Sequence, residues 1–289
     1  MLGIDLSQEL EKDYSVCGAD VAANAKSAVA EFYQADITDP KSIAAAIDKA
    51  RPDFVIHCAA RTDVDGCESD KNKAFAVNAE GARNVALASD EIGASLVFIS
   101  TDFVFDGKLS RPYRETDTPD PLGVYGASKL RGEEYVREAI DRHFILRTSW
   151  LYGGHGKNFV DTIIAKGAEG KELRVVSDQV GSPTYTKDLA EAIHALLGKV
   201  CTNDERRIDH GIYHLSNSGS VSWCDYAKAI LKLVGCATPV VPISSAELDR
   251  PARRPAMSVL DNSKFIAHAG YAMRGWQAAL QDYIKEKGR

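Results

Sequence analysis

Short apolar runs alternate with segments of helical periodicity along most of the sequence, and this alternation constrains the fold more than any other feature. Strands this apolar, separated by helices, are typical of a parallel sheet that helices cover on both faces. The strand-like runs are 14–20, 53–60, 95–101 and 144–153, and the helical segments are 41–50, 73–93 and 124–140. The pattern therefore predicts an α/β fold.

The alternation changes after Tyr152. A loop, GGHGKN (153–158), and an extended polar stretch, SDQVGSPTY (177–185), interrupt it before a helix and a strand return. We predict a Rossmann-like, doubly wound parallel sheet with a smaller C-terminal substrate-binding lobe. The expected dinucleotide-binding domain comprises 1–152, with 186–219 returning to it, and the expected lobe comprises 153–185 and 220–289.

Charge and composition argue against several classes of protein. The formal net charge is −6 and the basic residues are scattered among acids, so we expect no nucleic-acid partner. No apolar run is long enough to span a bilayer, and the first residues lack the features of a secretory signal. The 6 cysteines form no C-x-x-C pair and no cluster with zinc-ligand spacing. We therefore expect a cytoplasmic protein without a membrane partner or a metal site.

Tyr125 and Lys129 stand four residues apart in YGASK, within the helical segment 124–140, and so share one helix face. A lysine ammonium beside a tyrosine favours the phenolate and lowers the pKa of the phenol from about 10. Such a tyrosine can pass a proton to a carbonyl oxygen while a hydride reaches the carbon. Tyr283 and Lys287 have the same spacing, but there we expect only a solvated face of a charged helix.

The strand 95–101 ends in Ser100 and Thr101, and Asp102 follows it. Side chains at the carboxyl ends of strands in an open parallel sheet face the ligand crevice. Thr101 could therefore hydrogen-bond the carbonyl oxygen that Tyr125 protonates, although a hydroxyl at this place more often only caps a turn. A hydroxyl, a phenol and an ammonium directed at one crevice favour an active site.

Cofactor-binding residues are predicted beside the other strand ends. Ala59 and Ala60 are small enough to let a cofactor approach the backbone, although they equally suit helix–sheet packing. Asp36 could face an adenine amino group. Asp20 closes a strand at which an acid often holds the adenosine ribose, whereas nearby Lys26 would favour a 2'-phosphate. Both NADH and NADPH therefore stay open as cofactors.

Seven segments carry a family resemblance. They are, in order, STDFVFDG, PYRETDTPDPLGVYGASKLRGEE, ILRTSWLYG, NFV, DQVGSPTYTKDLA, GIYHLS and RPAMSVLDNSKF. Together they closely resemble the dTDP-4-dehydrorhamnose reductase family, which belongs to the extended short-chain dehydrogenase/reductases. The likeness extends over nearly all of the chain, and related epimerases usually lack the DQVGSPTY segment.

The resemblance implies a reaction and a set of residues. The reaction is reduction of the 4-keto group of dTDP-4-dehydro-L-rhamnose by NADPH or NADH, giving dTDP-L-rhamnose, so the expected partner is a nucleotide sugar. The implied catalytic residues are Thr101, Tyr125 and Lys129. The implied cofactor-binding residues are Gly3, Asp36, Ile37, Ala59, Ala60, Thr62, Tyr125 and Lys129. The implied substrate-binding residues are Thr101, Asp102, Phe103, Trp150 and Arg253.

Several of the substrate residues have alternatives or depart from the family pattern. Arg253 or Arg254 could reach the diphosphate, or both could lie in a surface loop. Trp150 could stack on a sugar or base, or serve as a core residue. Phe103 stands where the family commonly has tyrosine, and Gly123 stands where it usually has asparagine. We expect these two departures to alter substrate contact and leave the proton transfer intact.

The start of the chain is a further departure. The family begins with a strand and G-x-x-G-x-x-G, and Gly3 matches the third glycine. The family's first strand lies in the centre of the sheet, and its glycines let the pyrophosphate approach the helix N-terminus. Loss of that strand would leave unpaired backbone groups that cost roughly 1–3 kcal/mol each. We therefore expect Met1 to be an internal methionine of a protein that starts roughly ten residues earlier.

Two alternatives to an active reductase remain. One is a non-catalytic NADP-binding regulatory subunit, similar to the beta subunit of methionine adenosyltransferase, which shares this fold. The other is a truncated, inactive reductase. The DQVGSPTY segment favours the enzyme, because a binding subunit need not keep a sugar-nucleotide loop. The stereochemistry at C4 and the oligomeric state stay open, with a homodimer as one possibility.

Overall fold

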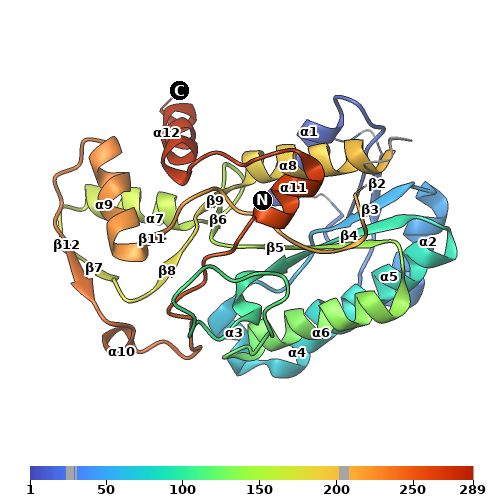
Figure 1. Ribbon diagram of the computed structural model, residues 1–289, viewed down its shortest axis with the longest axis horizontal. Helices are drawn as coiled ribbons and strands as arrows, with labels where there is room; N and C mark the ends of the chain where they lie inside the picture. The colour runs from blue at the N-terminus through green and yellow to red at the C-terminus, as the bar shows by residue number, and fades with distance from the viewer. Residues whose placement is uncertain (24–28, 30, 202–207, 289) are drawn as a thin grey trace.

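The computed structural model describes residues 1–23, 29, 31–201 and 208–288, so Lys26 lies outside the described residues. Its centre is a four-stranded parallel sheet in which β10 pairs with β5, β5 with β4, and β4 with β3 (Figure 1). These strands are β3 (Phe54–His57), β4 (Ser95–Thr101), β5 (His143–Thr148) and β10 (Gly211–His214). All residues of β4 are buried, because β4 has a strand on either side and helices on both faces.

Helices cover both faces of this sheet (Figure 1). One face packs on α1 (Leu2–Leu10), α8 (Thr186–Cys201) and α11 (Ser263–Ala269). The other face packs on α2 (Pro40–Ala50), α5 (Gly81–Glu91) and α6 (Val124–Ala139). Alternate residues of β4 enter the two cores: Val97 and Ile99 face α8, and Leu96 and Phe98 face α5 and α6. The predicted Rossmann-like, doubly wound α/β fold is confirmed.

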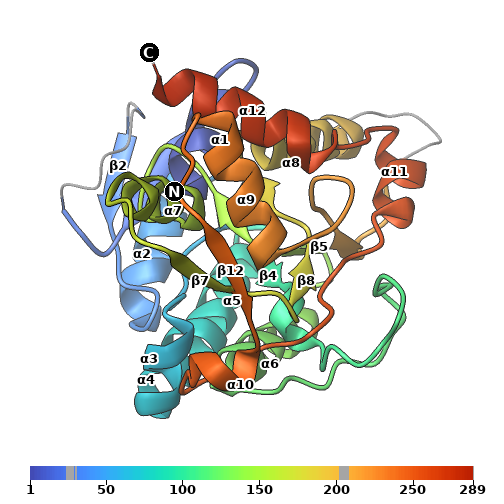
Figure 2. The same cartoon turned by 90° about the vertical axis from the view of Figure 1, so that its left-hand side faces the viewer.

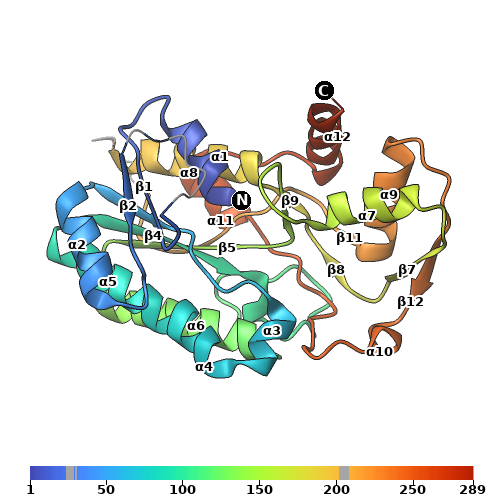
Figure 3. The ribbon, with the colours of Figure 1, turned by 180° about the vertical axis from the view of Figure 1, so that it is seen from behind.

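A second parallel pair, β1 (Cys17–Asp20) and β2 (Glu31–Gln34), lies beside the central sheet (Figure 3). Among the described residues, no strand pairs with the outer edge of β3 or with the free edge of β1. Phe54, Val55 and Ile56 of β3 are only half-buried, whereas the sequence predicts a buried strand there. The expectation that a further strand precedes Met1 stays a prediction.

One helical prediction needs correction. The segment 73–93 is not one α-helix, because α4 (Lys71–Phe75) passes into a π-helical turn, η1 (Ala76–Glu80), before α5 begins. Such turns are frequent at functional sites, and this one carries the buried Asn78. At the start of the chain, Met1 is the N-cap of α1 and Gly3 lies within the first turn of the helix.

The C-terminal part forms a lobe with its own core, seen at the front of Figure 2. Its short strands pair as β7 with β12, β8 with β11, and β6 with β9. No helix among the described residues is long and apolar enough to cross a membrane. The strands are β6 (Leu151–Tyr152), β7 (Leu173–Val176), β8 (Val180–Gly181), β9 (Thr184–Tyr185), β11 (Val221–Ser222) and β12 (Val240–Ile243). The helices are α7 (Phe159–Ala168), α9 (Trp223–Leu233), α10 (Ser245–Leu248) and α12 (Trp276–Lys287).

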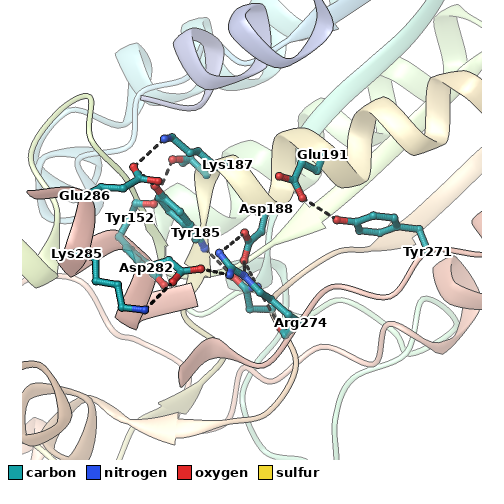
Figure 4. Close-up of polar contacts among 12 residues, drawn as sticks. Tyr152, Tyr185, Lys187, Asp188, Glu191, Tyr271, Arg274, Asp282, Lys285 and Glu286 are labelled. Carbon is teal, nitrogen blue, oxygen red and sulfur yellow. Dashed lines mark hydrogen bonds and ion pairs between the residues drawn. The ribbon is translucent and has the colours of Figure 1, made fainter. Parts of the chain in front are cut away.

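Ion pairs join α12 to the start of α8 (Figure 4). Lys187 pairs with Glu286 at 2.7 Å, and the guanidinium of Arg274 donates to both carboxylate oxygens of Asp188 at 2.9 Å. These side chains line a cavity of about 420 Å³. The charged groups of its lining pair with one another, except Glu191, which accepts from the Tyr271 hydroxyl. The network fixes the last helix of the chain against α8.

Tyr283 and Lys287 do not form the solvated face that the sequence predicts. The side chain of Tyr283 is buried in the lobe core, and its hydroxyl donates to Asp161 at 2.9 Å. Lys287 pairs with the same carboxylate. Burial among apolar residues of α7 and α9 outweighs the charged character of α12, so this pair is a structural contact.

Close packing of α6 on η1 makes Gly132 sensitive to substitution. A Cβ atom at Gly132 would lie 2.4 Å from the carbonyl oxygen of Asn78 and 3.1 Å from the Phe98 ring. We expect Gly132→Ala to lower the free energy of unfolding in urea by about 1–3 kcal/mol, because backbone atoms must move. Gly198→Ala on α8 is the control, since no atom lies within 4 Å there. It should raise stability by about 0.5–1 kcal/mol, and equal effects of the two substitutions would contradict the packing argument.

Candidate active site

The predicted catalytic residues meet where β4 ends beneath the first turns of α6. Thr101 is the last residue of β4 and lies opposite Thr148 in the β4–β5 register. Its hydroxyl donates to Asp102 at 3.0 Å, and it also accepts from the backbone N–H of Phe103 at 3.2 Å. This second contact begins a 3₁₀ turn, η2 (Asp102–Val104). The hydroxyl therefore has both a local role and a place in the site.

Tyr125, in the first turn of α6, faces this strand end. Its ring meets the Phe103 ring edge to face, with 5.5 Å between centroids. Burial raises the pKa of the Tyr125 phenol, and a hydrogen bond with the Thr101 hydroxyl partly opposes that shift. The phenol therefore stays protonated at neutral pH, which suits a proton donor.

Lys129 lies one turn further along α6 and is almost fully buried. Its Nζ donates to the carbonyl oxygen of Ile99 at 2.7 Å and lies 4.0 Å from the centre of the Phe98 ring. Burial lowers the pKa of Lys129 to about 7, although the Glu133 carboxylate raises it. The expectation that Lys129 lowers the pKa of Tyr125 is not met, because burial dominates at both side chains and the ammonium is directed at Ile99.

Asp102 is buried at the same strand end. One of its carboxylate oxygens has no hydrogen-bond partner among the described residues. Burial raises the pKa of Asp102 to about 7, while hydrogen bonds from Ser258 and Thr101 favour the ionised form. The carboxyl group is thus close to half-protonated at neutral pH and can donate or accept a hydrogen bond.

The end of β3 offers a surface for a cofactor. Ala59 and Thr62 are exposed and Ala60 is half-buried, so small side chains line the chain there. Asn78 of η1 fixes this loop: it accepts from the Arg61 backbone N–H at 2.7 Å and donates to the Arg61 carbonyl at 3.1 Å. Sequence reasoning missed Asn78, although a buried polar residue within an apolar helical pattern was a usable signal.

The predicted adenine contacts lie after β2. The Asp36 carboxylate accepts from the backbone N–H and the hydroxyl of Thr38, and these bonds lower its pKa. The Ile37 side chain packs so closely on Gly81 that a Cβ there would lie 2.7 Å from it. Asn84 donates to the Ile37 carbonyl at 2.9 Å. Both residues are thus fixed in place, with Asp36 engaged in its own turn.

Glu68 accounts for Gly123, the departure beside the catalytic helix. Glu68 lies on α3 (Val64–Ser69) and accepts from the backbone N–H of Val124 at 2.7 Å. The carboxylate caps the N-terminus of α6, a function that a side chain at position 123 would otherwise serve. A Cβ at Gly123 would lie 2.6 Å from the same oxygen, so glycine leaves room for this cap.

Asp65, also on α3, distinguishes the two candidate arginines, because it binds Arg254 and leaves Arg253 exposed. Its carboxylate binds Arg254 at 2.9 Å, Arg250 at 3.1 Å and the backbone N–H of Ala252 at 3.1 Å. Arg253 is exposed, and its carbonyl oxygen lies near Gly123. The loop is therefore clamped to α3 by Arg250 and Arg254, and Arg253 stands at the rim of the site.

Trp150 stacks on a protein side chain. Its ring lies parallel to that of Trp223, with 3.5 Å between centroids and 5° between planes. Its φ of 48° is rare for a bulky residue, and a Cβ at Gly181 would lie 2.4 Å from its ring. Trp223 thus covers one ring face and Gly181 packs close against the ring, so the half-buried Trp150 has a packing role and only part of its indole remains for a ligand.

The raised pKa of Asp102 gives a testable pH dependence. Because burial raises this pKa to about 7, the folded state binds a proton that the unfolded state releases between about pH 4 and 7. Stability from this group is therefore lost as the pH rises. We expect Asp102→Asn to exceed the wild type in free energy of unfolding by about 1–4 kcal/mol at pH 8, with little difference at pH 4.

The control for this measurement is Asp106→Asn. Lys108 and Tyr113 hold the pKa of Asp106 at about 2, so its contribution to stability is present above pH 4 and is lost as the pH falls. Urea unfolding at pH 4, 6 and 8 should therefore show a difference from the wild type that changes with pH for Asp102→Asn and stays nearly constant for Asp106→Asn. An Asp102→Asn difference that does not change with pH would contradict the assignment.

Known proteins resemble this chain over its whole length. A family profile described as RmlD substrate binding domain matches residues 1–288. The spore coat polysaccharide biosynthesis protein SpsK of Bacillus subtilis (strain 168) is 42% identical over 286 residues, which cover 99% of this chain and 94% of that protein. The dTDP-4-dehydrorhamnose reductase of Streptomyces griseus is 41% identical over 285 residues, covering 98% and 89%.

A solved structure gives the same result. The dTDP-4-dehydrorhamnose reductase from Bacillus anthracis str. Ames in complex with NADP superposes with a TM-score of 0.85 at 38% identity, covering 97% of this chain and 95% of that one. The motif resemblance found in the sequence is confirmed. The chain therefore belongs to the RmlD family, that of the dTDP-4-dehydrorhamnose reductases.

Proposed function

We propose that the protein reduces the 4-keto group of a dTDP-4-dehydro-6-deoxy sugar with NADPH or NADH, converting dTDP-4-dehydro-L-rhamnose to dTDP-L-rhamnose. The observation that carries the proposal is the convergence of Thr101, Tyr125 and Lys129 at the carboxyl end of β4. The reductases named among its relatives support the same reaction.

The side chains around the strand ends fit a dinucleotide. Exposed, small residues at Ala59 and Thr62 leave the backbone after β3 accessible, and Asn78 holds that backbone in place. Among the described residues, no atom lies within 4 Å of a Cβ placed at Gly3 in the first turn of α1, where a helix N-terminus favours a phosphate. A relative solved with NADP supports this cofactor class.

The chemistry divides between cofactor and protein. A reduced nicotinamide, when bound, supplies the hydride to the carbonyl carbon of the sugar. Tyr125 donates its phenolic proton to the carbonyl oxygen, which becomes the hydroxyl of the product. Transfer is favourable because an alkoxide is more basic than a phenolate. The Thr101 hydroxyl orients the same oxygen. Burial keeps Tyr125 protonated at rest, and during transfer the positive charge of Lys129 partly offsets the negative charge that develops on the phenolic oxygen, until solvent returns the proton.

Substrate recognition is assigned to the rim around this centre. Arg253 is exposed beside the N-terminus of α6 and suits a diphosphate, since guanidinium donates to phosphate oxygens in pairs. Asp102 and Phe103 follow Thr101 and adjoin the carbonyl position. The exposed part of the half-buried Trp150 indole suits a sugar ring or base.

Removal of the Tyr125 hydroxyl tests the proton donor. We expect Tyr125→Phe to lower kcat for NADPH oxidation with the 4-keto sugar by about 10²–10⁴-fold, because the variant lacks the phenol that donates the proton and a positioned general acid contributes about this much. The dissociation constant for NADPH, measured by fluorescence, should change little. Tyr283→Phe is the matched control, since it removes the hydroxyl of the second Y-x-x-x-K pair and should keep the wild-type kcat. A Tyr125→Phe variant with full activity would disprove the assignment.

Substitution of the two neighbouring arginines tests the diphosphate contact. We expect Arg253→Ala to raise KM for the nucleotide sugar by about 10-fold with a small change in kcat, because a charge-assisted contact is worth roughly 1.5–3 kcal/mol at most. Arg254→Ala should instead lower the Tm, because it breaks the contact with Asp65. If both variants show the same KM, Arg253 has no special role in substrate binding.

A further inference from the structure

A buried carboxylate, Glu133, bridges two neighbouring strands just below the site. Ser100 and Arg147 lie opposite each other in the β4–β5 register. Arg147 donates to both oxygens of Glu133, from Nε at 2.9 Å and from Nη2 at 2.6 Å, and the Ser100 hydroxyl donates to the first of them. The side chains of Glu133 and Arg147 are each only 2% exposed.

We do not expect this ion pair to contribute much to the free energy of folding. Two charges removed from water lose solvation, and their attraction often only offsets that loss. What the pair does provide is direction, because the bidentate contact fixes the carboxylate relative to both strands. Glu133 therefore holds α6 at one height and one rotation above the ends of β4 and β5.

The same helix face carries the proposed catalytic groups. Tyr125, Lys129 and Glu133 follow one another at intervals of four residues, so they lie along one side of α6. Ser100, which Glu133 contacts, directly precedes Thr101. The contact that fixes Glu133 thus also fixes the separation of Tyr125 and Lys129 from Thr101.

Glu133 also acts on Lys129 through its charge, which raises the pKa of the ammonium. The titratable groups that act on this ammonium are Glu133 on its own helix and His57 and Cys58 at the end of β3. Burial keeps the imidazole of His57 unprotonated and the thiol of Cys58 protonated at neutral pH. Among the groups described here, Glu133 therefore remains as the anion that favours the ammonium form.

We propose that Glu133 is a positioning residue for the Tyr125–Lys129 pair, held by Arg147 and Ser100 so that its carboxylate fixes α6 against the strand ends and keeps the proton on Lys129. The link to catalysis rests on the proposed reductase function. The positions of the groups and the charge state of Lys129 can be tested without any substrate.

The test is a titration of Lys129 in the full chain. Protein with ¹³C-labelled lysine is followed by NMR from pH 5 to 10, and Lys129→Met identifies the signal. We expect Glu133→Gln to lower the pKa of Lys129 by about one unit or more. Glu133→Asp keeps the charge and should restore most of the wild-type value. Glu134→Gln, the neighbouring but more exposed carboxylate of α6, is the control and should leave the pKa unchanged.

Two outcomes would overturn the proposal. One is an unchanged pKa in Glu133→Gln. The other is an equal decrease in Glu133→Gln and Glu133→Asp, which would trace the shift to lost packing. If Glu133→Gln fails to fold, Ser100→Ala carries the test, because it removes one contact and keeps the charge. Amide hydrogen exchange in 124–139 should then be faster than in Glu134→Gln, and equal rates would reject the positioning role.

The reductase assay separates this proposal from the proposed function. If the wild type is an active reductase, the Glu133→Gln variant should lose kcat at a lower pH than the wild type does. This shift of the alkaline limb of the kcat–pH profile should match the decrease in the pKa of Lys129. A shift in the titration with no turnover of the nucleotide sugar by the wild type would contradict the reductase function alone. A shift in kcat without a shift in the titration would contradict the positioning role.

Discussion

Parallel pairing of β4 with β3 and β5 is the constraint on which the rest of the structure depends. Because parallel strands end at the same edge, the polar residues that close β4 are delivered into the interior together. Ser100, Thr101 and Asp102 are all buried, and each needs a partner there. Glu133 serves Ser100, while Thr101 bonds to Asp102. The hydrogen bonds that these buried polar groups need for folding therefore also fix the positions of the groups proposed to react.

Burial also explains the ionisation of the proposed catalytic groups. At the surface, a lysine ammonium would act on a neighbouring tyrosine mainly through its charge, which favours the phenolate. Here desolvation lowers the pKa of Lys129 and raises that of Tyr125. Burial therefore favours the neutral amine of Lys129 and the neutral phenol of Tyr125 over their charged forms. The ammonium finds its hydrogen bond in a strand carbonyl, at Ile99. Spacing along a helix predicts which side chains share a face, but it does not predict how much water remains around them.

The sequence predicts the elements of this fold well because periodicity is a local property. The strand over 95–101 and the helix over 124–140 follow from their apolar patterns, and their proximity follows from the rules of parallel sheets. The contacts that Glu68 and Asp65 of α3 make with distant segments have no such local signal. Glu68 meets Val124 from 56 residues away, and Asp65 meets Arg254 from 189 residues away. Such partners are chosen by the packing of distant segments, so only the structure identifies them.

The stacked indoles of Trp150 and Trp223 have a consequence for observing this molecule. Trp150 follows β5 in the central sheet, and Trp223 begins α9 in the lobe. Two indoles in close contact couple their strong electronic transitions, and such coupling gives a pair of bands of opposite sign in far-ultraviolet circular dichroism. Separation of the two segments would weaken that signal. The signal of this tryptophan pair therefore reports whether the central sheet and the C-terminal lobe keep their contact.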